Sequence, residues 1–277
     1  MIDLHSHTSE SDGTFSPLEL VQEASSQSLE ALAITDHDTF AGYDAALPFA
    51  KHAGLDLVCG IELSTRFHAT SVHLLAYFPN QPPTPEFRSW IDSLLASRNE
   101  RNERMAARLR SLGVEITLDE VKRYGRSLTG RPHFARVLVD KGYVRSMQQA
   151  FEEYLDESAK GYVQREEADF GDSVQRVTRA GGIASVAHPI RLRGLQIQDA
   201  LPEMCDLGLR AMEVIHSDHS PANVAEYRAL ARHFGLAMTG GSDFHGANKP
   251  EIQLGTGNQG NVSVPLALLT TLRELCR

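Results

Sequence analysis

Nine side chains that can bind metal ions stand at or just beyond the ends of short apolar runs in this chain. A polar residue at the end of a strand, repeated around a barrel, places all such residues in a single mouth. The set mixes six imidazoles with three carboxylates, which suits manganese, iron or zinc better than a closed structural zinc site. The predicted metal ligands are His5, His7, Asp12, His37, Glu62, His73, His188, Asp243 and His245.

The length of 277 residues suits one (β/α) barrel with room for a small inserted lobe. Strand-like and helical patterns alternate along both ends of the chain, whereas the middle shows only helical periodicity. We therefore predict an α/β barrel formed by residues 1–96 and 169–277, interrupted by a helical insertion over residues 97–168. The expected strands are Ile2–His5, Ala31–Thr35, Leu57–Leu63, Val72–Phe78, Ile183–Ala187, Ala211–Ile215 and Leu236–Thr239.

Two features indicate how these residues share metal ions. His5 and His7 are two residues apart in an extended segment, so both rings lie on one face and can bind one ion. Glu62 has two carboxylate oxygens and can therefore bridge two ions. Two ions about 3.5–4 Å apart form a clamp for in-line displacement at phosphorus and lower the pKa of a bound water. The chain has no Gly-x-Ser-x-Gly or Cys-x-x-Cys motif, so a serine or cysteine nucleophile is not expected.

These residues occur in motifs that resemble those of the PHP (polymerase and histidinol phosphatase) family. The motifs span nearly the whole chain: His5-Ser6-His7, Thr35-Asp36-His37-Asp38, Gly60-Ile61-Glu62, Val72-His73, Ala187-His188-Pro189 and Ser242-Asp243-Phe244-His245. The resemblance implies a distorted (β/α)7 barrel, a centre of two or three divalent ions, and hydrolysis of phosphoesters. It also implies three ligand sets: His5, His7, Glu62 and Asp243; Glu62, His73 and His188; and Asp12, His37 and His245.

A narrower resemblance concerns the expected insertion and the later strands. Gly130-Arg131-Pro132-His133, Lys160-Gly161-Tyr162-Val163, and the segments around Arg191 and His216 are similar to a PHP branch that contains a nucleoside 3′,5′-bisphosphate phosphatase and relatives that trim short RNA. In that branch the insertion covers the barrel mouth, which implies phosphate binding by Arg131, Lys160 and Arg191. Guanidinium groups suit this role because they bind phosphate through two hydrogen bonds and keep their charge. His133 and His216 are expected to bind phosphate or move a proton, with a hydrogen bond that holds a loop as the alternative.

Together these features predict a metal-dependent phosphomonoesterase that converts a nucleoside 3′,5′-bisphosphate, such as adenosine 3′,5′-bisphosphate, into the 5′-monophosphate. His216 or Asp243 would handle protons. Two or three divalent ions, Mn²⁺ ahead of Zn²⁺ or Fe²⁺, would be the cofactors. The alternatives are a 5′-to-3′ exoribonuclease on short RNA, a histidinol phosphatase, and a catalytically inactive metal-binding module. The intact ligand set argues against the inactive module.

Charge and composition narrow the expected partners. The net charge of −9 gives no overall basic surface, so we expect a small nucleotide or short single-stranded RNA and no long duplex. Arg98, Arg101 and Arg104 could follow a nucleic-acid strand, but the glutamates between them favour an ordinary solvated helix face. The three cysteines are far apart and odd in number, and the chain shows no signal-like or membrane-spanning apolar run. We therefore expect a cytoplasmic protein without membrane contact.

Overall fold

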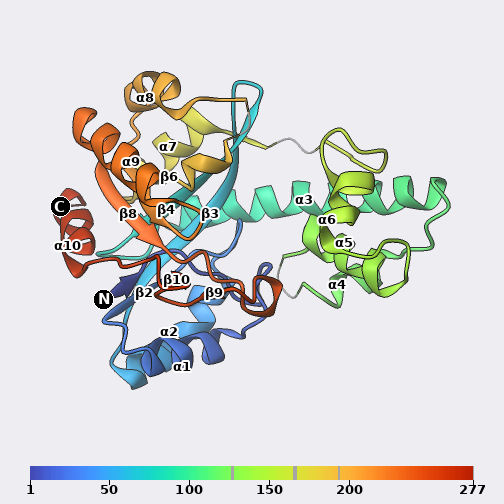
Figure 1. Cartoon of the computed structure of the whole chain (residues 1–277), viewed down its shortest axis with the longest axis horizontal. Helices are drawn as coiled ribbons and strands as arrows, with labels where there is room; N and C mark the ends of the chain where they lie inside the picture. Colours follow the sequence, from blue (N-terminus) through green and yellow to red (C-terminus); the bar gives the residue numbers. More distant parts are fainter. Residues whose placement is uncertain (126–127, 165–166, 193, 277) are drawn as a thin grey trace.

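The computed structural model describes residues 1–125, 128–164, 167–192 and 194–276, and seven strands in this part form a nearly closed barrel (Figure 1). The strand order follows the chain. β4 is antiparallel to both neighbours, and the other adjacent pairs are parallel. A hydrogen bond of 2.8 Å from the Asp243 amide to the His5 carbonyl connects the two ends of the sheet. The strands are β1 (Ile2–Asp3), β2 (Ala31–Ile34), β3 (Asp56–Phe67), β4 (Thr70–Phe78), β6 (Ile183–Val186), β7 (Ala211–His216) and β8 (Ala237–Gly241), with β5 (Ala168–Asp169) paired to β3 outside this order.

Side chains on the long strands alternate between the barrel interior and the surrounding helices. On β3, Cys59 and Ile61 belong to the outer apolar core, whereas Val58 belongs to the inner one. Glu62 lies four residues beyond Val58 and therefore on the same face of the strand. The inner core includes side chains of α10 (Leu266–Leu275), which closes one end of the barrel. The interior is thus apolar at the closed end and polar at the open end, where the strands deliver their ligands.

Helices flank the barrel, and local sequence signals set their ends. The Ser16 hydroxyl accepts a hydrogen bond from the Glu19 amide, and the Glu19 carboxylate accepts one from the Ser16 amide at 2.7 Å, which defines the start of the first helix. The second helix ends at Gly54, whose φ of 69° is a left-handed conformation that glycine adopts without strain. These helices are α1 (Pro17–Ser26), α2 (Ala41–Ala53), α7 (Phe170–Arg179), α8 (Ile197–Asp206) and α9 (Pro221–His233).

A helical lobe projects from one side of the barrel (Figure 1). Its longest helix, α3 (Pro85–Ser111), begins against the barrel, where Phe87 and Ile91 join the outer core. The helix ends in the lobe, where Met105 and Leu109 join a separate apolar cluster. No proline or glycine interrupts it after its first residue, so one helix spans both regions and the predicted boundary at residue 97 falls inside it. The other lobe helices are α4 (Leu118–Lys122), α5 (Arg131–Asp140), α6 (Met147–Ala150) and the π-helical turn η1 (Phe151–Leu155).

The predicted α/β barrel with an inserted helical lobe is confirmed, and the main difference lies in β3. This strand reaches Phe67, four residues beyond the predicted end at Leu63, because it stays paired with β4 up to the hairpin turn. In the described residues, no helix is both long and apolar enough to cross a membrane. The short elements that complete the fold are the 3-10 turns η2 (Pro189–Arg191) and η3 (Gly246–Asn248) and the hairpin of β9 (Ile252–Gln253) and β10 (Gly257–Asn258).

Candidate metal centre and the cavity beside it

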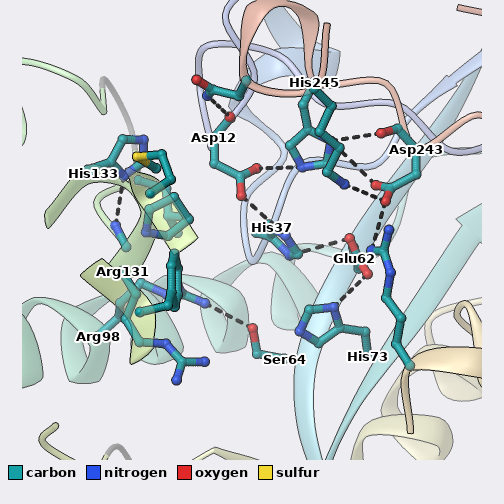
Figure 2. Close-up of a pocket in the computed structure, with 18 of the residues that line it drawn as sticks. Asp12, His37, Glu62, Ser64, His73, Arg98, Arg131, His133, Asp243 and His245 are labelled. Atoms are coloured by element: carbon teal, nitrogen blue, oxygen red, sulfur yellow. Dashed lines mark hydrogen bonds and ion pairs between the residues drawn. The ribbon is translucent and has the colours of Figure 1, made fainter. Parts of the chain in front are cut away.

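The open end of the barrel brings the nine predicted ligands into one cluster, in which Figure 2 labels Asp12, His37, Glu62, His73, Asp243 and His245. Glu62 and His73 project from β3 and β4, and the others lie in the segments that follow strands. A parallel bridge between His37 and Glu62, and another between Ser6 and Phe244, extend the strand pairing into these segments. Pairing therefore continues past the strand ends and fixes the ligand-bearing loops relative to one another.

Glu62 occupies the centre of the cluster. It is 1% exposed, and both of its oxygens face imidazole nitrogens from different strand ends. Oε1 lies 2.8 Å from His73 Nδ1 and 2.9 Å from His188 Nε2. Oε2 lies within 3.4 Å of nitrogens on three further rings, those of His5, His7 and His37. One carboxylate thus joins two groups of imidazoles, as a bridging ligand must.

In the described residues, candidate ligand atoms form four overlapping groups, each with its atoms within 4.8 Å of one another. Two buried imidazole nitrogens near Glu62, His7 Nε2 and His37 Nδ1, have no hydrogen-bond partner in the described structure. Unpaired buried nitrogens are costly, so these lone pairs suit ligation of an ion. The donor set therefore fits divalent cations. Three of the groups consist of predicted ligands: His5, His7, Glu62 and Asp243; His7, Asp12, His37 and His245; and His37, Glu62 and His73. The fourth joins the predicted ligand His5 to Glu213 and His216.

The pKa values of His37, His188 and Glu62 suit metal ligation, which needs neutral imidazoles and ionised carboxylates. Burial lowers the pKa of His37 to about 4 and that of His188 to about 3. Burial alone would raise the pKa of Glu62, but the surrounding imidazoles hold it well below the usual range. For His7 burial is also unfavourable to charge, yet the adjacent carboxylates of Asp243 and Glu62 raise its pKa to about 9. The position between these carboxylates therefore attracts positive charge.

Glu213 forms hydrogen bonds with two of the predicted ligands, although it was not itself predicted as a site residue. Its Oε1 is 2.8 Å from His5 Nδ1, and its Oε2 accepts a hydrogen bond of 2.7 Å from the His188 amide. The bond to Nδ1 orients the His5 ring so that Nε2 faces Glu62, 3.2 Å away. The sequence did contain a signal for Glu213, because it is a carboxylate within the apolar run Ala211–Ile215, where a buried charge needs a partner.

A cavity of about 350 Å³ lies between the cluster and the helical lobe. The lobe contributes guanidinium groups and an apolar patch to its wall. Arg98 and Arg101 are 8% and 5% exposed, so the prediction of a solvated helix face is wrong for both, although Arg104 is exposed. They are buried because the middle of α3 packs across the open end of the barrel. The cavity wall on the lobe side includes Arg98, Arg101, Leu128, Arg131, Met147, Phe151 and Tyr162.

The predicted phosphate-binding residues do not all reach this cavity. Arg131 lines it, with its guanidinium 5.8 Å from the centre of the Tyr162 ring. Arg191 also lines it, paired with Asp218 and with Asp243. Lys160 is exposed and is not among the lining residues, and its ammonium lies over the Tyr154 ring at 4.1 Å. The structure therefore brings two of the three predicted residues to the site.

His133 and His216 are held by their surroundings in ways that differ from each other. His133 lines the cavity, and its Nδ1 accepts a hydrogen bond of 2.9 Å from the Gly130 amide, which fits the predicted loop-holding alternative. His216 is 1% exposed and does not line the cavity. Its Nδ1 accepts the Asp218 amide at 3.0 Å, and its Nε2 is 3.4 Å from Asp243 Oδ2. It contacts the cluster through Asp243 rather than through the open space.

Asp243 is the meeting point of the cluster and the cavity cations. Its Oδ1 lies 3.4 Å from His5 Nε2 and 3.3 Å from His7 Nε2. Its Oδ2 accepts hydrogen bonds from Arg191 at 2.9 Å and from Lys249 at 2.7 Å. One oxygen thus faces the predicted ions and the other holds two cations at the cavity wall. Lys249 belongs to no recognisable sequence motif and was therefore not predicted as a site residue.

The open end of this barrel holds imidazoles and carboxylates around one shared glutamate. These features place the chain in a class of metal-binding barrel proteins. The PHP domain model matches residues 3–163 of this chain, which is more than half of its length. The chain therefore belongs to the PHP domain family, as its motifs predict.

Relatives within this family carry several named activities. A 5′-3′ exoribonuclease from Haemophilus influenzae is 33% identical over 246 residues, which cover 88% of this chain and 89% of that protein. A 3′,5′-nucleoside bisphosphate phosphatase from Chromobacterium violaceum is 32% identical over 248 residues, covering 88% and 87%. The solved structure of an amidohydrolase from Chromobacterium violaceum, with bound sulfate and no metal, has a TM-score of 0.84 and 29% identity and covers 98% and 96%. The solved structure shares the fold of this chain, whereas the names of the relatives differ in the reaction.

Proposed function

We propose that this protein is a metal-dependent phosphomonoesterase that removes the 3′-phosphate from nucleoside 3′,5′-bisphosphates and leaves the 5′-monophosphate. The observation that carries the proposal is the cavity itself, which has predicted metal ligands on one side and buried guanidinium groups on the other. A substrate with two phosphates needs two separate anion sites. The named phosphatase among the relatives supports this choice of substrate.

The ligand sets would hold two or three divalent ions, of which Mn²⁺ suits the mixed donors best. His5, His7, Glu62 and Asp243 would hold one ion. Glu62, His73 and His188 would hold a second, with His37 close enough to contribute. Asp12, His37 and His245 would hold a third. Such ions stabilise negative charge on phosphoryl oxygens and activate a water at neutral pH.

The side chains of the chain itself would bind and orient the substrate. Arg191 is fixed by Asp218 and Asp243 beside the predicted ions, where its guanidinium can contact the phosphate that is cleaved. Arg131 lies on the lobe side and is placed to hold the phosphate that is retained. Local cations are needed because the net charge of −9 does not attract an anion. Asp243, which Arg191 and Lys249 favour in its ionised form, would accept a proton from the attacking water, and His216 contacts its Oδ2.

The exoribonuclease alternative has support from a relative that carries this name. A cavity of about 350 Å³ is at the lower end of the range of small-ligand pockets, about 300–1,000 Å³. It can enclose one nucleotide, so RNA would have to place only its terminal nucleotide inside. We favour the mononucleotide for this reason. Histidinol phosphate is less favoured because it carries only one phosphate, which leaves the lobe cations without an anion to bind.

A side-by-side assay separates these activities. The Mn²⁺-loaded protein would be given adenosine 3′,5′-bisphosphate, a short 5′-phosphorylated RNA and histidinol phosphate, with Glu62→Gln protein as the control for contaminating hydrolases. We expect the highest kcat/KM for the bisphosphate and release of the 3′-phosphate only. Higher kcat/KM for RNA would support the exoribonuclease instead. Absence of hydrolysis with all three substrates and with an aryl phosphate would leave only the inactive metal-binding module.

A further inference from the structure

Arg98 connects the helical lobe to the segments that carry two predicted metal ligands. Its guanidinium forms a buried ion pair with Asp38 and donates a hydrogen bond of 3.0 Å to the Ser64 hydroxyl (Figure 2 shows the contact with Ser64). Asp38 directly follows His37, and Ser64 lies two residues beyond Glu62 on β3. Arg98 therefore contacts the neighbours of both ligands without belonging to any ligand group.

Asp38 contacts both Arg98 and Ser64, and its backbone has a strained conformation. Its carboxylate accepts hydrogen bonds from the Ser64 amide at 2.9 Å and the Ser64 hydroxyl at 3.0 Å, and its own amide donates to the Glu62 carbonyl at 3.0 Å. Its φ of 48° is unfavourable for a residue other than glycine, so the surrounding bonds must hold it. Asp38 does not cap the following helix, whose N-cap is Phe40. Its bonds fix the turn that presents His37.

A second contact joins the lobe to the ligand-bearing loops. His133, at the start of α5, is 4% exposed, lies beside the backbone of Ser11 and accepts a hydrogen bond from the Gly130 amide. Ser11 directly precedes the predicted ligand Asp12, and its hydroxyl donates a hydrogen bond of 2.6 Å to Asp36. The lobe is thus attached to the segments of three predicted ligands through two buried polar residues.

We propose that Arg98 is a positioning residue that couples docking of the helical lobe to metal binding in the barrel. When Arg98 holds Asp38 and Ser64, the ligands His37 and Glu62 are fixed, and when ions fix those ligands, the partners of Arg98 are held for the lobe. The coupling is reciprocal, so each event strengthens the other by the same factor. This inference rests on the metal ligands assigned in the proposed function.

The test uses the full-length chain with Arg98→Met, which keeps the length of the side chain but removes its charge and its donors. Arg98→Lys keeps the charge but not the branched donors. Arg104→Met is the matched control, because Arg104 lies on the same helix but is exposed and contacts only the Gln164 carbonyl at 3.4 Å among the bonds described. The readouts are the Kd for Mn²⁺ and hydrogen exchange of residues 131–140 with and without Mn²⁺.

We expect Arg98→Met to raise the Kd for Mn²⁺ by about 10- to 100-fold, the range typical of residues that support metal ligands. Mn²⁺ should slow exchange of α5 in the wild-type protein and have little effect in this variant. Arg98→Lys should restore part of the Mn²⁺ affinity, and Arg104→Met should behave like wild type. If Arg98→Met does not fold, Ser64→Ala removes only the two hydrogen bonds of the Ser64 hydroxyl, with Arg98 and with Asp38, and should raise the Kd several-fold.

The outcomes distinguish this inference from the proposed function. Wild-type Kd values in Arg98→Met or in a folded Ser64→Ala would overturn the coupling, while metal binding and phosphatase activity stayed intact. The same holds if Mn²⁺ leaves exchange of α5 unchanged in the wild-type protein. A wild-type protein that binds no Mn²⁺ at all would refute the proposed metal centre, and the coupling with it.

Discussion

Replacing Glu62 by glutamine tests the centre of the proposed site more directly than any other change. Glutamine keeps the size of the side chain and one carbonyl oxygen, but its amide nitrogen cannot bind a cation and its charge is lost. Both oxygens of Glu62 face imidazoles in the structure, at 2.8–3.4 Å, so both proposed ions that share it lose a ligand or its charge. Asp12→Asn is the matched comparison, because Asp12 belongs to only one ligand group and its side chain is 11% exposed.

The expected loss of Mn²⁺ affinity can be worked out from the burial of Glu62. Removing one partner of a buried charged pair costs about 3–5 kcal/mol, and each 1.4 kcal/mol changes an affinity about tenfold. We therefore expect Glu62→Gln to raise the Kd for Mn²⁺ by about 10²- to 10³-fold, and Asp12→Asn by about tenfold, the lower end for supporting groups. The assay measures bound Mn²⁺ per chain at fixed free Mn²⁺, together with kcat/KM on an aryl phosphate. Equal losses of activity in both variants, with bound metal retained in both, would refute the bridging role of Glu62.

Three further predictions address the metals, the substrate and the barrel closure. Strong chelation should abolish hydrolysis and Mn²⁺ should restore it, whereas activity that survives complete metal removal would contradict the metal centre. Arg131→Ala and Arg191→Ala should each lower kcat/KM on the bisphosphate about 10²-fold, the effect of losing a charged hydrogen bond of about 2–3 kcal/mol. The Arg131→Ala loss should be smaller on an aryl phosphate, and equal losses would point to misfolding instead. Asp3→Asn should lower the free energy of unfolding in urea by about 3 kcal/mol or more, because buried Asp3 accepts hydrogen bonds from Ser242 and Gly255. A change below about 1 kcal/mol, the value of one neutral hydrogen bond, would show that the charge of Asp3 is not needed.

The positions of the predicted ligands could be read from the sequence because each depends on local pattern. A short apolar run predicts a strand, and the polar residue at its end then lies at the barrel mouth. The contacts that hold the ligands in place could not be predicted in the same way. His5 meets Glu213 across 208 positions of sequence, and that distance closes only when β1 and β7 enter the same barrel.

The buried arginines were mispredicted because their environment is not set by their own helix. On α3 the neighbouring glutamates give the pattern of a surface helix, and Arg104 does face solvent. Arg98 and Arg101 lie on the side that packs over the barrel opening, where Asp38 provides the opposite charge for Arg98. Which face of a helix becomes buried depends on what it crosses. A single sequence contains no local signal for a crossing between residues 60 positions apart.

Backbone strain at the site is a further property that the sequence pattern does not predict. Asp38, His188 and Asp243 have φ values of 48°, 25° and 57°, a region in which glycine would normally be expected. Glycine would relieve the strain but would remove a side chain that the cluster uses. His188 contacts Glu62 at 2.9 Å, and Asp243 contacts both the imidazoles and the cavity cations. Such conformations persist only where the surroundings hold them, so the bonds through Glu213, Ser64 and Arg98 are part of what makes this arrangement of ligands possible.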